Sequence, residues 1–97
     1  MKIFELNGDL FEDVEGFYDE IDKLLTKDLA WPTGHNLDAY NDLLRGGFGV
    51  HEYGEPIVIR WLNFEKSKRE LGVDFVQEII DITTDDRWGH RCTLELC

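Results

Sequence analysis

The feature that most constrains the fold is a run of β-branched and aromatic residues near the middle of the chain. Residues 56–61 read P-I-V-I-R-W, which suits a buried strand, with proline tolerated at the first position. Segments with helical periodicity lie on both sides of this run. Strands that are connected through helices pair in parallel, so we expect a parallel sheet.

Two periodicities predict the remaining elements. Alternating apolar and polar residues predict strands at residues 2–6 and 91–96, the first with Ile3 and either Phe4 or Leu6 facing the interior. Apolar residues that recur every three or four positions predict four helices, at residues 11–27, 36–44, 62–71 and 74–84.

The predicted order is therefore β-α-α-β-α-α-β, in which right-handed crossovers connect parallel strands. The fold class that we expect is α/β, with a three-stranded parallel sheet packed with about four helices. The chain has 97 residues, of which 42% are hydrophobic, so it can bury one core. We expect residues 1–97 to form a single domain.

The charge of the chain restricts its partners. Ten Lys and Arg residues against 21 Asp and Glu residues give a formal net charge of −11 at pH 7. A field of this sign repels nucleic acid and anionic lipid and attracts basic proteins. Acidic residues also keep proteins soluble whatever they bind. The net charge therefore excludes some classes of partner but does not identify one.

The cysteines and the N-terminal segment indicate the compartment. Cys92 and Cys97 are five residues apart, so on a strand they face opposite sides and cannot pair without a sharp bend. Without a second such pair they do not form a zinc motif. We therefore expect both thiols to be reduced, and we expect no metal or cofactor. The chain also lacks a signal-peptide core and a membrane-spanning run, so we expect a cytoplasmic protein.

The helix predicted at residues 36–44 carries the most informative pair of side chains. Asp38 and Asp42 are four residues apart and therefore lie on one face, one turn apart. The helix dipole favours a carboxylate at Asp38 in the first turn, but Asp42 lies beyond that turn. Two such carboxylates resemble the phosphates that a nuclease active site binds with Lys, Arg and His.

This region also resembles a known family. Residues 29–46, L-A-W-P-T-G-H-N-L-D-A-Y-N-D-L-L-R-G, are similar to the signature of the barstar family, in which a proline-containing loop leads into G-x-N-L-D-A-x-x-D-x-L. Residues 57–68, I-V-I-R-W-L-N-F-E-K-S-K, are similar to the strand-then-helix block of that family. The resemblance covers nearly the whole chain and becomes loose after Leu71.

The resemblance implies an intracellular inhibitor of a secreted ribonuclease, built on a three-stranded parallel sheet. The loop and the acidic helix would then block the active site of the enzyme. Asp38 and Asp42 fall on the two contact aspartates of the family, with Asp42 as the principal anchor, and Asn36 falls on the asparagine that caps the helix. The further contacts expected at this site are Thr33, Gly34, His35, Tyr40 and Asn41.

The chain departs from the family pattern in ways that bear on the partner. The loop between Pro32 and Gly34 is two residues shorter than in the archetype and lacks its tyrosine. Asn41 stands where the archetype has an aromatic residue, and Asp81 is the nearest match for a further acidic contact on the last helix. Aromatic residues dominate many interfaces, and two of them are missing here, so we expect the partner to be a basic nuclease other than barnase itself. We expect the inhibitor to be a monomer when free.

Two other functions remain open from the sequence. His35, Asp38 and Asp42 lie nearly on one helical face and can be interpreted as the metal ligands of a small hydrolase. Alternatively, the chain is an acidic scaffold that has lost nuclease binding. No Ser/His/Asp order or phosphate-binding glycine loop indicates catalysis, so we expect no enzyme. Tyr40 is either a core residue or a contact, and we expect His51 and His90 to be solvated.

Overall fold

The computed structural model describes residues 2–26, 34–47, 50–85, 87 and 90–97. The order of its elements matches the predicted β-α-α-β-α-α-β pattern, with one short 3-10 helix, η1, added after the first strand. The elements are β1 (Lys2–Asn7), η1 (Gly8–Leu10), α1 (Val14–Leu25), α2 (Leu37–Arg45), β2 (Ile57–Leu62), α3 (Phe64–Leu71), α4 (Val73–Thr84) and β3 (Cys92–Leu96).

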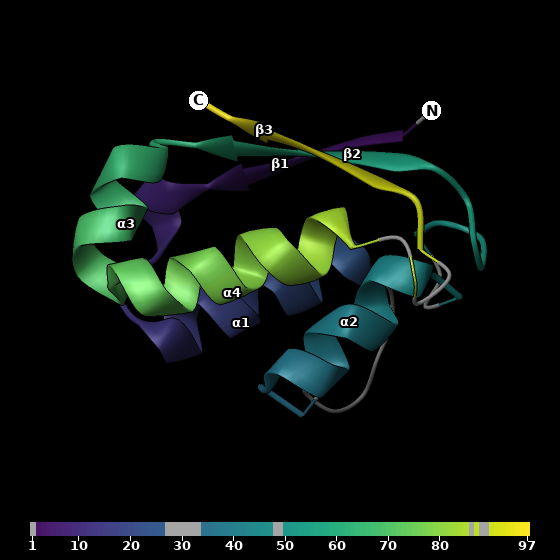
Figure 1. Cartoon of the computed structure of the whole chain (residues 1–97), viewed down its shortest axis with the longest axis horizontal. Coiled ribbons are helices and arrows are strands. Elements are labelled where there is room, and N and C mark those ends of the chain that lie inside the picture. The colour runs from purple at the N-terminus through teal and green to yellow at the C-terminus, as the bar shows by residue number, and fades with distance from the viewer. Residues whose placement is uncertain (1, 27–33, 48–49, 86, 88–89) are drawn as a thin grey trace.

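The three strands form one parallel sheet in the order β1-β2-β3, which confirms the predicted fold class. Figure 1 shows α1, α2 and α4 on one side of this sheet, with α3 at one end of it. The central strand β2 buries Ile57, Ile59 and Trp61 on the side of the helices. The opposite face of the sheet is open, and there Arg60 pairs with Glu95 across the strands.

The pairing register decides which side chains of β1 point inward. Phe4 and Leu6 pack toward the helices, whereas Ile3 lies opposite Val58 on the open face and is 53% exposed. The prediction that Ile3 faces the interior was therefore wrong. Successive side chains of a strand point to opposite faces, so burying Leu6 places Ile3 outside.

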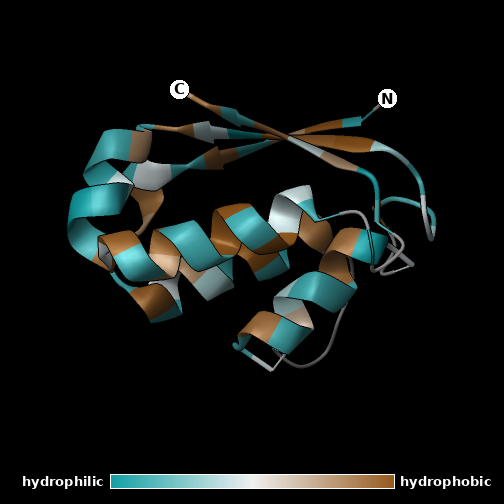
Figure 2. Ribbon diagram, in the orientation of Figure 1, coloured by the Kyte–Doolittle hydropathy of each residue, from teal (hydrophilic) through white to brown (hydrophobic). Residues whose placement is uncertain are grey.

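The core lies between the sheet and the helices around Trp61, which is fully buried. Its indole stacks on Phe17 of α1 at 5.6 Å between ring centroids, and its Nε1–H donates to Ser67 Oγ of α3 at 3.1 Å. In Figure 2 the helices carry both apolar and hydrophilic stretches, as expected of amphipathic helices that cover one face of a sheet.

Local capping explains where the helix boundaries differ from the prediction. Helix α1 begins at Val14 and not at Phe11, because the Asp13 side chain accepts a hydrogen bond from the backbone N–H of Gly16 at 2.7 Å. Helix α2 ends before Gly46, whose φ of 94° is easily adopted only by glycine. A Cβ atom at Gly46 would also collide with the carbonyl of Glu52.

His51 and His90 are buried, at 4% and 2% exposure, so the prediction that they are solvated was wrong. In each ring Nε2 lies near a backbone carbonyl oxygen in the last turn of a helix, Leu44 O at 3.2 Å and Ile82 O at 2.8 Å. Such carbonyls have no partner within the helix. Both imidazoles therefore donate to a helix C-terminus, a role that local sequence patterns do not reveal.

The cysteines Cys92 and Cys97 are both free. Burial raises the pKa of the Cys92 thiol to about 12, whereas Cys97 is exposed. None of the helices in the described part of the chain is long and apolar enough to cross a membrane.

Candidate functional site

The start of α2 is fixed by a cap that the sequence predicts. Asn36 Oδ1 accepts a hydrogen bond from the backbone N–H of Ala39 at 2.8 Å, and Asn36 Nδ2 donates to the carbonyl of Gly34 at 3.1 Å. A Cβ atom on Gly34 would lie only 2.9 Å from Asn36 Nδ2. A side chain larger than that of glycine at this position would therefore make the capping side chain of Asn36 shift.

The buried face of α2 holds Tyr40, Leu43 and Leu44 at 0–2% exposure. The hydroxyl of Tyr40 lies 2.6 Å from Thr83 Oγ1 of α4, and burial raises the pKa of the Tyr40 hydroxyl. Tyr40 is thus a core residue that connects α2 to α4, and it is not available as a partner contact. Its aromatic ring sits inside because α4 covers this side of α2.

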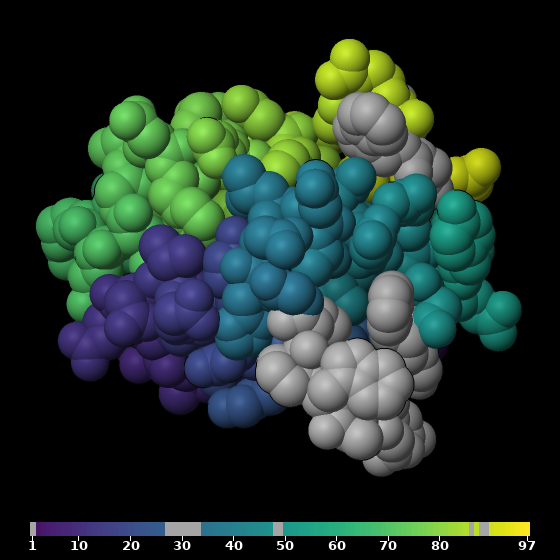
Figure 3. All heavy atoms as spheres, turned by 90° about the horizontal axis from the view of Figure 1, so that it is seen from below, coloured from purple at the N-terminus to yellow at the C-terminus, as the bar shows by residue number. Residues whose placement is uncertain are grey.

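Asp38 and Asp42 are exposed on the outer side of α2, and Figure 3 shows this helix between α1 and α4 on the surface of the molecule. Asp38 lies in the first turn of the helix, where the dipole favours its charge. No cation in the described ranges pairs with Asp38. The predicted arrangement of two outward carboxylates one turn apart is present.

Asp42 does not stand alone, because Arg45 Nη2 of the same helix donates to its Oδ1. The Asp42 side chain is nevertheless 58% exposed, and that of Arg45 is 28% exposed. An ion pair on the surface contributes only about 0–1 kcal/mol, so a cation of a partner can replace Arg45. The outer face of α2 therefore offers one free carboxylate and one that is held by its own helix.

His35 is turned away from the two aspartates and toward α1. Its Nδ1 lies 2.8 Å from Glu15 Oε2, and its Nε2 lies 3.0 Å from Asp22 Oδ2 and 3.5 Å from Asp19 Oδ1. The hydrogen bond with Glu15, followed by that with Asp22, raises the pKa of His35 against the opposing effect of burial. Its imidazole also stacks on Tyr18 at 5.6 Å.

The orientation of His35 weighs against the metal-site interpretation, because His35 does not point toward Asp38 and Asp42. Among the residues that the structure describes, no group of three or more His, Cys, Asp or Glu side chains is arranged to hold a metal ion. Nothing in the described geometry supports a metal-dependent hydrolase.

The structure describes the surroundings of two of the other predicted contacts, Asn41 and Asp81. Asn41 is half-buried, and its Oδ1 is a buried acceptor without a hydrogen-bond partner in the described structure. Asp81 is exposed on α4 and accepts a hydrogen bond from Gln77 Nε2 at 2.9 Å. Thr33 lies outside the described residues.

The sequence prediction overlooked the groups that bind the predicted site residues. Arg45 lies three positions after Asp42 on a predicted helix, which is a spacing that permits an ion pair. Glu15, Asp19 and Asp22 recur at four and three positions, so they form one acidic stripe on α1. These spacings were visible, but the contact of the stripe with His35 depends on the packing of α1 against α2.

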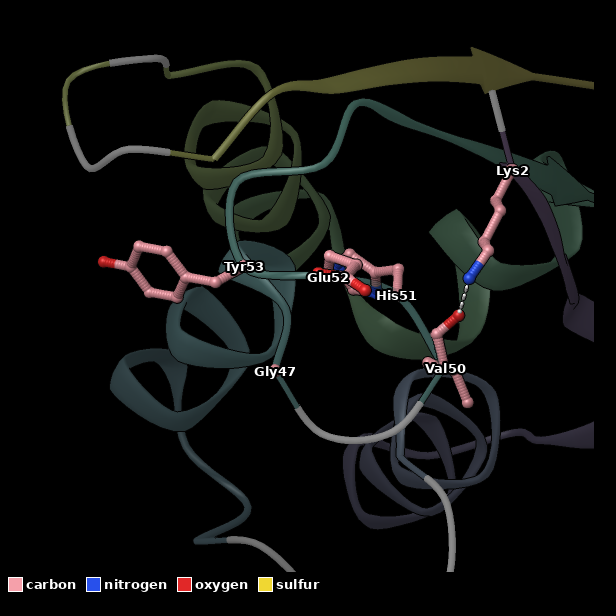
Figure 4. Close-up of a pocket in the computed structure, with 6 residues that line it drawn as sticks. All are labelled: Lys2, Gly47, Val50, His51, Glu52 and Tyr53. Carbon is pink, nitrogen blue, oxygen red and sulfur yellow. Dashed lines mark hydrogen bonds between the residues drawn. The ribbon is translucent and has the colours of Figure 1, made fainter.

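A pocket of about 300 Å³ lies beyond the C-terminal end of α2 and is drawn in Figure 4. The Lys2 ammonium on its wall is already engaged, since Nζ donates to the carbonyl of Val50 at 2.5 Å and lies 3.8 Å from Glu55 Oε1. The pocket is lined by Lys2, Gly47, Val50, His51, Glu52 and Tyr53.

Comparison with known proteins adds one match that covers almost the whole chain. Residues 1–94 match the family model described as Barstar (barnase inhibitor). The comparison with curated proteins gave no match. The family match includes β1, β2, the acidic helix α2 and the first three residues of β3.

Proposed function

Because this chain belongs to the barstar family, whose members are inhibitors and not enzymes, we propose that it inhibits a basic ribonuclease toxin inside the cell that produces the toxin. The observation that carries this proposal is the pair of exposed carboxylates, Asp38 and Asp42, on a capped helix whose other face is buried. In the proposed complex this helix occupies the active site of the enzyme.

The chemistry of such a site supports the proposal. A ribonuclease active site gathers cations that bind phosphate oxygens, and carboxylates form short, charge-assisted hydrogen bonds with the same groups. A net charge of −11 attracts a basic enzyme over a distance and raises the rate of encounter. The rigid attachment of α2 through Tyr40 reduces the entropy lost on binding.

Arg45 changes what the partner must provide. In the free protein the Asp42 carboxylate is bound to Arg45, so a cation of the enzyme replaces an existing partner instead of meeting a bare charge. A toxin that binds with high affinity is expected to offer an acceptor to the released guanidinium. Together with the missing loop tyrosine, this favours a nuclease related to barnase over barnase itself.

The test measures binding to barnase and to any small basic nuclease that inspection of the neighbouring reading frames identifies. Surface plasmon resonance would give rate constants for the wild type and for the Asp38→Ala and Asp42→Ala variants. Truncating one partner of a buried, hydrogen-bonded charge pair mainly changes the dissociation rate, and the barnase–barstar complex is a reference case for such charge pairs. Removing either aspartate should accelerate dissociation, with the larger effect at Asp42.

Two control variants separate direct contact from general charge. Glu65→Gln, on the exposed surface of α3, should leave dissociation unchanged, while Glu52→Gln should mainly slow association. Wild-type affinity for either nuclease with no change in the Asp38→Ala and Asp42→Ala variants would remove α2 as the interface. Absence of binding to both nucleases would favour the acidic scaffold.

A further inference from the structure

His35 is held by three carboxylates that all come from α1. Glu15 faces its Nδ1 at 2.8 Å, while Asp22 and Asp19 face its Nε2 at 3.0 and 3.5 Å. The imidazole lies flat against Tyr18, with an angle of 20° between the rings. Only 19% of the His35 side chain is exposed, so the ring is enclosed by α1 on several sides.

This arrangement requires a protonated imidazole. A carboxylate only accepts hydrogen bonds, whereas a neutral imidazole has one N–H donor and one nitrogen with a bare lone pair. With carboxylates on both sides, a neutral ring would direct that lone pair at an oxygen of Glu15 or Asp22. The imidazolium donates from both nitrogens and satisfies both contacts.

The position of His35 in the chain connects this contact to the proposed site. His35 lies between Gly34 and the capping residue Asn36, and its φ of 48° is in the left-handed region that non-glycine residues rarely adopt. Such a conformation persists where surrounding contacts hold it. The ion pairs with α1 therefore hold the backbone from which α2 begins, three residues before Asp38.

We propose that His35 is a positioning residue: its imidazolium fastens the start of α2 to α1, so that the acidic helix is held for its partner only while His35 is protonated. The effect on binding to the enzyme rests on the proposed function. The attachment of α2 to α1 through His35, called the fastening step below, does not. In this role His35 acts through the backbone of α2 and not through its own contact with the enzyme.

The charged groups around His35 determine the direction of the pH effect. From α1 these groups are Glu15, Asp19 and Asp22, whose carboxylates all lie beside the ring. Tyr18, on which the ring stacks, has its own pKa raised by burial and then by Glu15 and by Glu78 of α4. The carboxylates that face His35 from α1 therefore favour the charged form of its ring.

The direction in which stability changes with pH follows from the raised pKa of His35. A histidine whose folded-state pKa exceeds its unfolded value contributes stability that is fully present below the unfolded value of about 6.5. That contribution is lost as the pH rises through the folded-state pKa. The start of α2 should therefore be held most firmly below about pH 6.5 and should loosen as the pH rises through the folded-state pKa of His35.

The first experiment uses the free protein and does not depend on any toxin. NMR would follow the His35 ring and the backbone amides of Asn36 and Ala39 between pH 5.5 and 9. We expect these amides to shift with the midpoint of His35, and the protection factor of the Ala39 amide, which corrects for the intrinsic pH dependence of exchange, to fall above that midpoint. Amides that do not follow the His35 titration would overturn the fastening step.

The second experiment measures dissociation from the nuclease that binds, over the same pH range. Wild-type dissociation should accelerate by about two- to fivefold as His35 loses its proton, the size expected of partly exposed ion pairs. His35→Gln should dissociate at the fast rate at every pH, and His35→Lys, which restores the charge, should dissociate at the slow rate.

Matched variants distinguish positioning from a general effect on the fold. Glu15→Gln should lower the midpoint of His35 and shift the pH profile of dissociation with it, whereas Glu65→Gln on α3 should alter neither. If His35→Lys behaved like His35→Gln at every pH, the charge of His35 would not be what holds α2. If no nuclease bound but the amides followed His35, the proposed function would fail while the fastening step stood.

Discussion

The contact between Tyr40 and Thr83 leads to a prediction whose donor can be assigned from geometry. Thr83 Oγ1 lies 2.6 Å from the backbone carbonyl of Ile79, which only accepts hydrogen bonds, so the single hydroxyl proton of Thr83 goes there. Tyr40, whose hydroxyl lies 2.6 Å from the same oxygen, must then be the donor. Burial raises the pKa of Tyr40, which keeps that proton in place.

The two single substitutions should therefore have unequal costs. Tyr40→Phe removes the donor and loses one hydrogen bond, which lowers the free energy of unfolding by about 1 kcal/mol. Thr83→Val leaves the Tyr40 hydroxyl buried without an acceptor, which costs about 2 kcal/mol. The double variant removes both polar groups and should lose no more than about 1 kcal/mol, so the pair is coupled by roughly 2 kcal/mol.

Urea denaturation followed by tryptophan fluorescence would measure all three variants. Thr84→Val is the matched control, because Thr84 Oγ1 makes the same bond to Ile80 O at 2.8 Å but on the exposed side of α4. That variant should change stability by less than about 0.5 kcal/mol. Additive losses in the double variant, or a smaller loss for Thr83→Val than for Tyr40→Phe, would refute the assignment of the donor.

Three further predictions concern α2 and the thiols. Asn36→Ala should lower the free energy of unfolding by about 1 kcal/mol in urea denaturation, because it removes the N-cap of α2; an unchanged stability would contradict the capping role. Arg45→Ala should accelerate association with a basic nuclease in stopped-flow measurements by exposing the charge of Asp42, and Lys23→Ala, which opens a comparable pair on α1, should accelerate it less. Cys97 should react rapidly with a thiol reagent at pH 8 and Cys92 slowly, since a pKa of about 12 leaves roughly one thiolate in ten thousand at that pH; equal rates would show that Cys92 is not protected.

Much of the fold could be predicted because its determinants are local. The β-branched run of β2, the alternation in β1 and β3, and the three- and four-residue spacing in the helices predicted the order of strands and helices. The parallel sheet followed from that order, since helical crossovers connect parallel neighbours. The outward placement of Asp38 and Asp42 followed from the same spacing.

The errors concern side chains whose environment is built by distant segments. Ile3 faces outward because of the register between β1 and β2, and His51 and His90 are buried because each reaches a carbonyl at the end of a helix. For Tyr40 the sequence left core and contact open, and the packing of α4 against α2 decided for the core. None of these outcomes can be read from neighbouring residues.

Periodicity along the chain by itself determined the architecture, the acidic helix and the side on which its carboxylates stand, and the resemblance to the barstar family added the cap at Asn36. The tertiary structure alone decided how those groups are held: His35 meets Glu15 twenty residues away, and Tyr40 meets Thr83 forty-three residues away. The physical reason is that helix and strand patterns arise from neighbours within a few residues, whereas ion pairs and buried hydrogen bonds depend on which elements pack together.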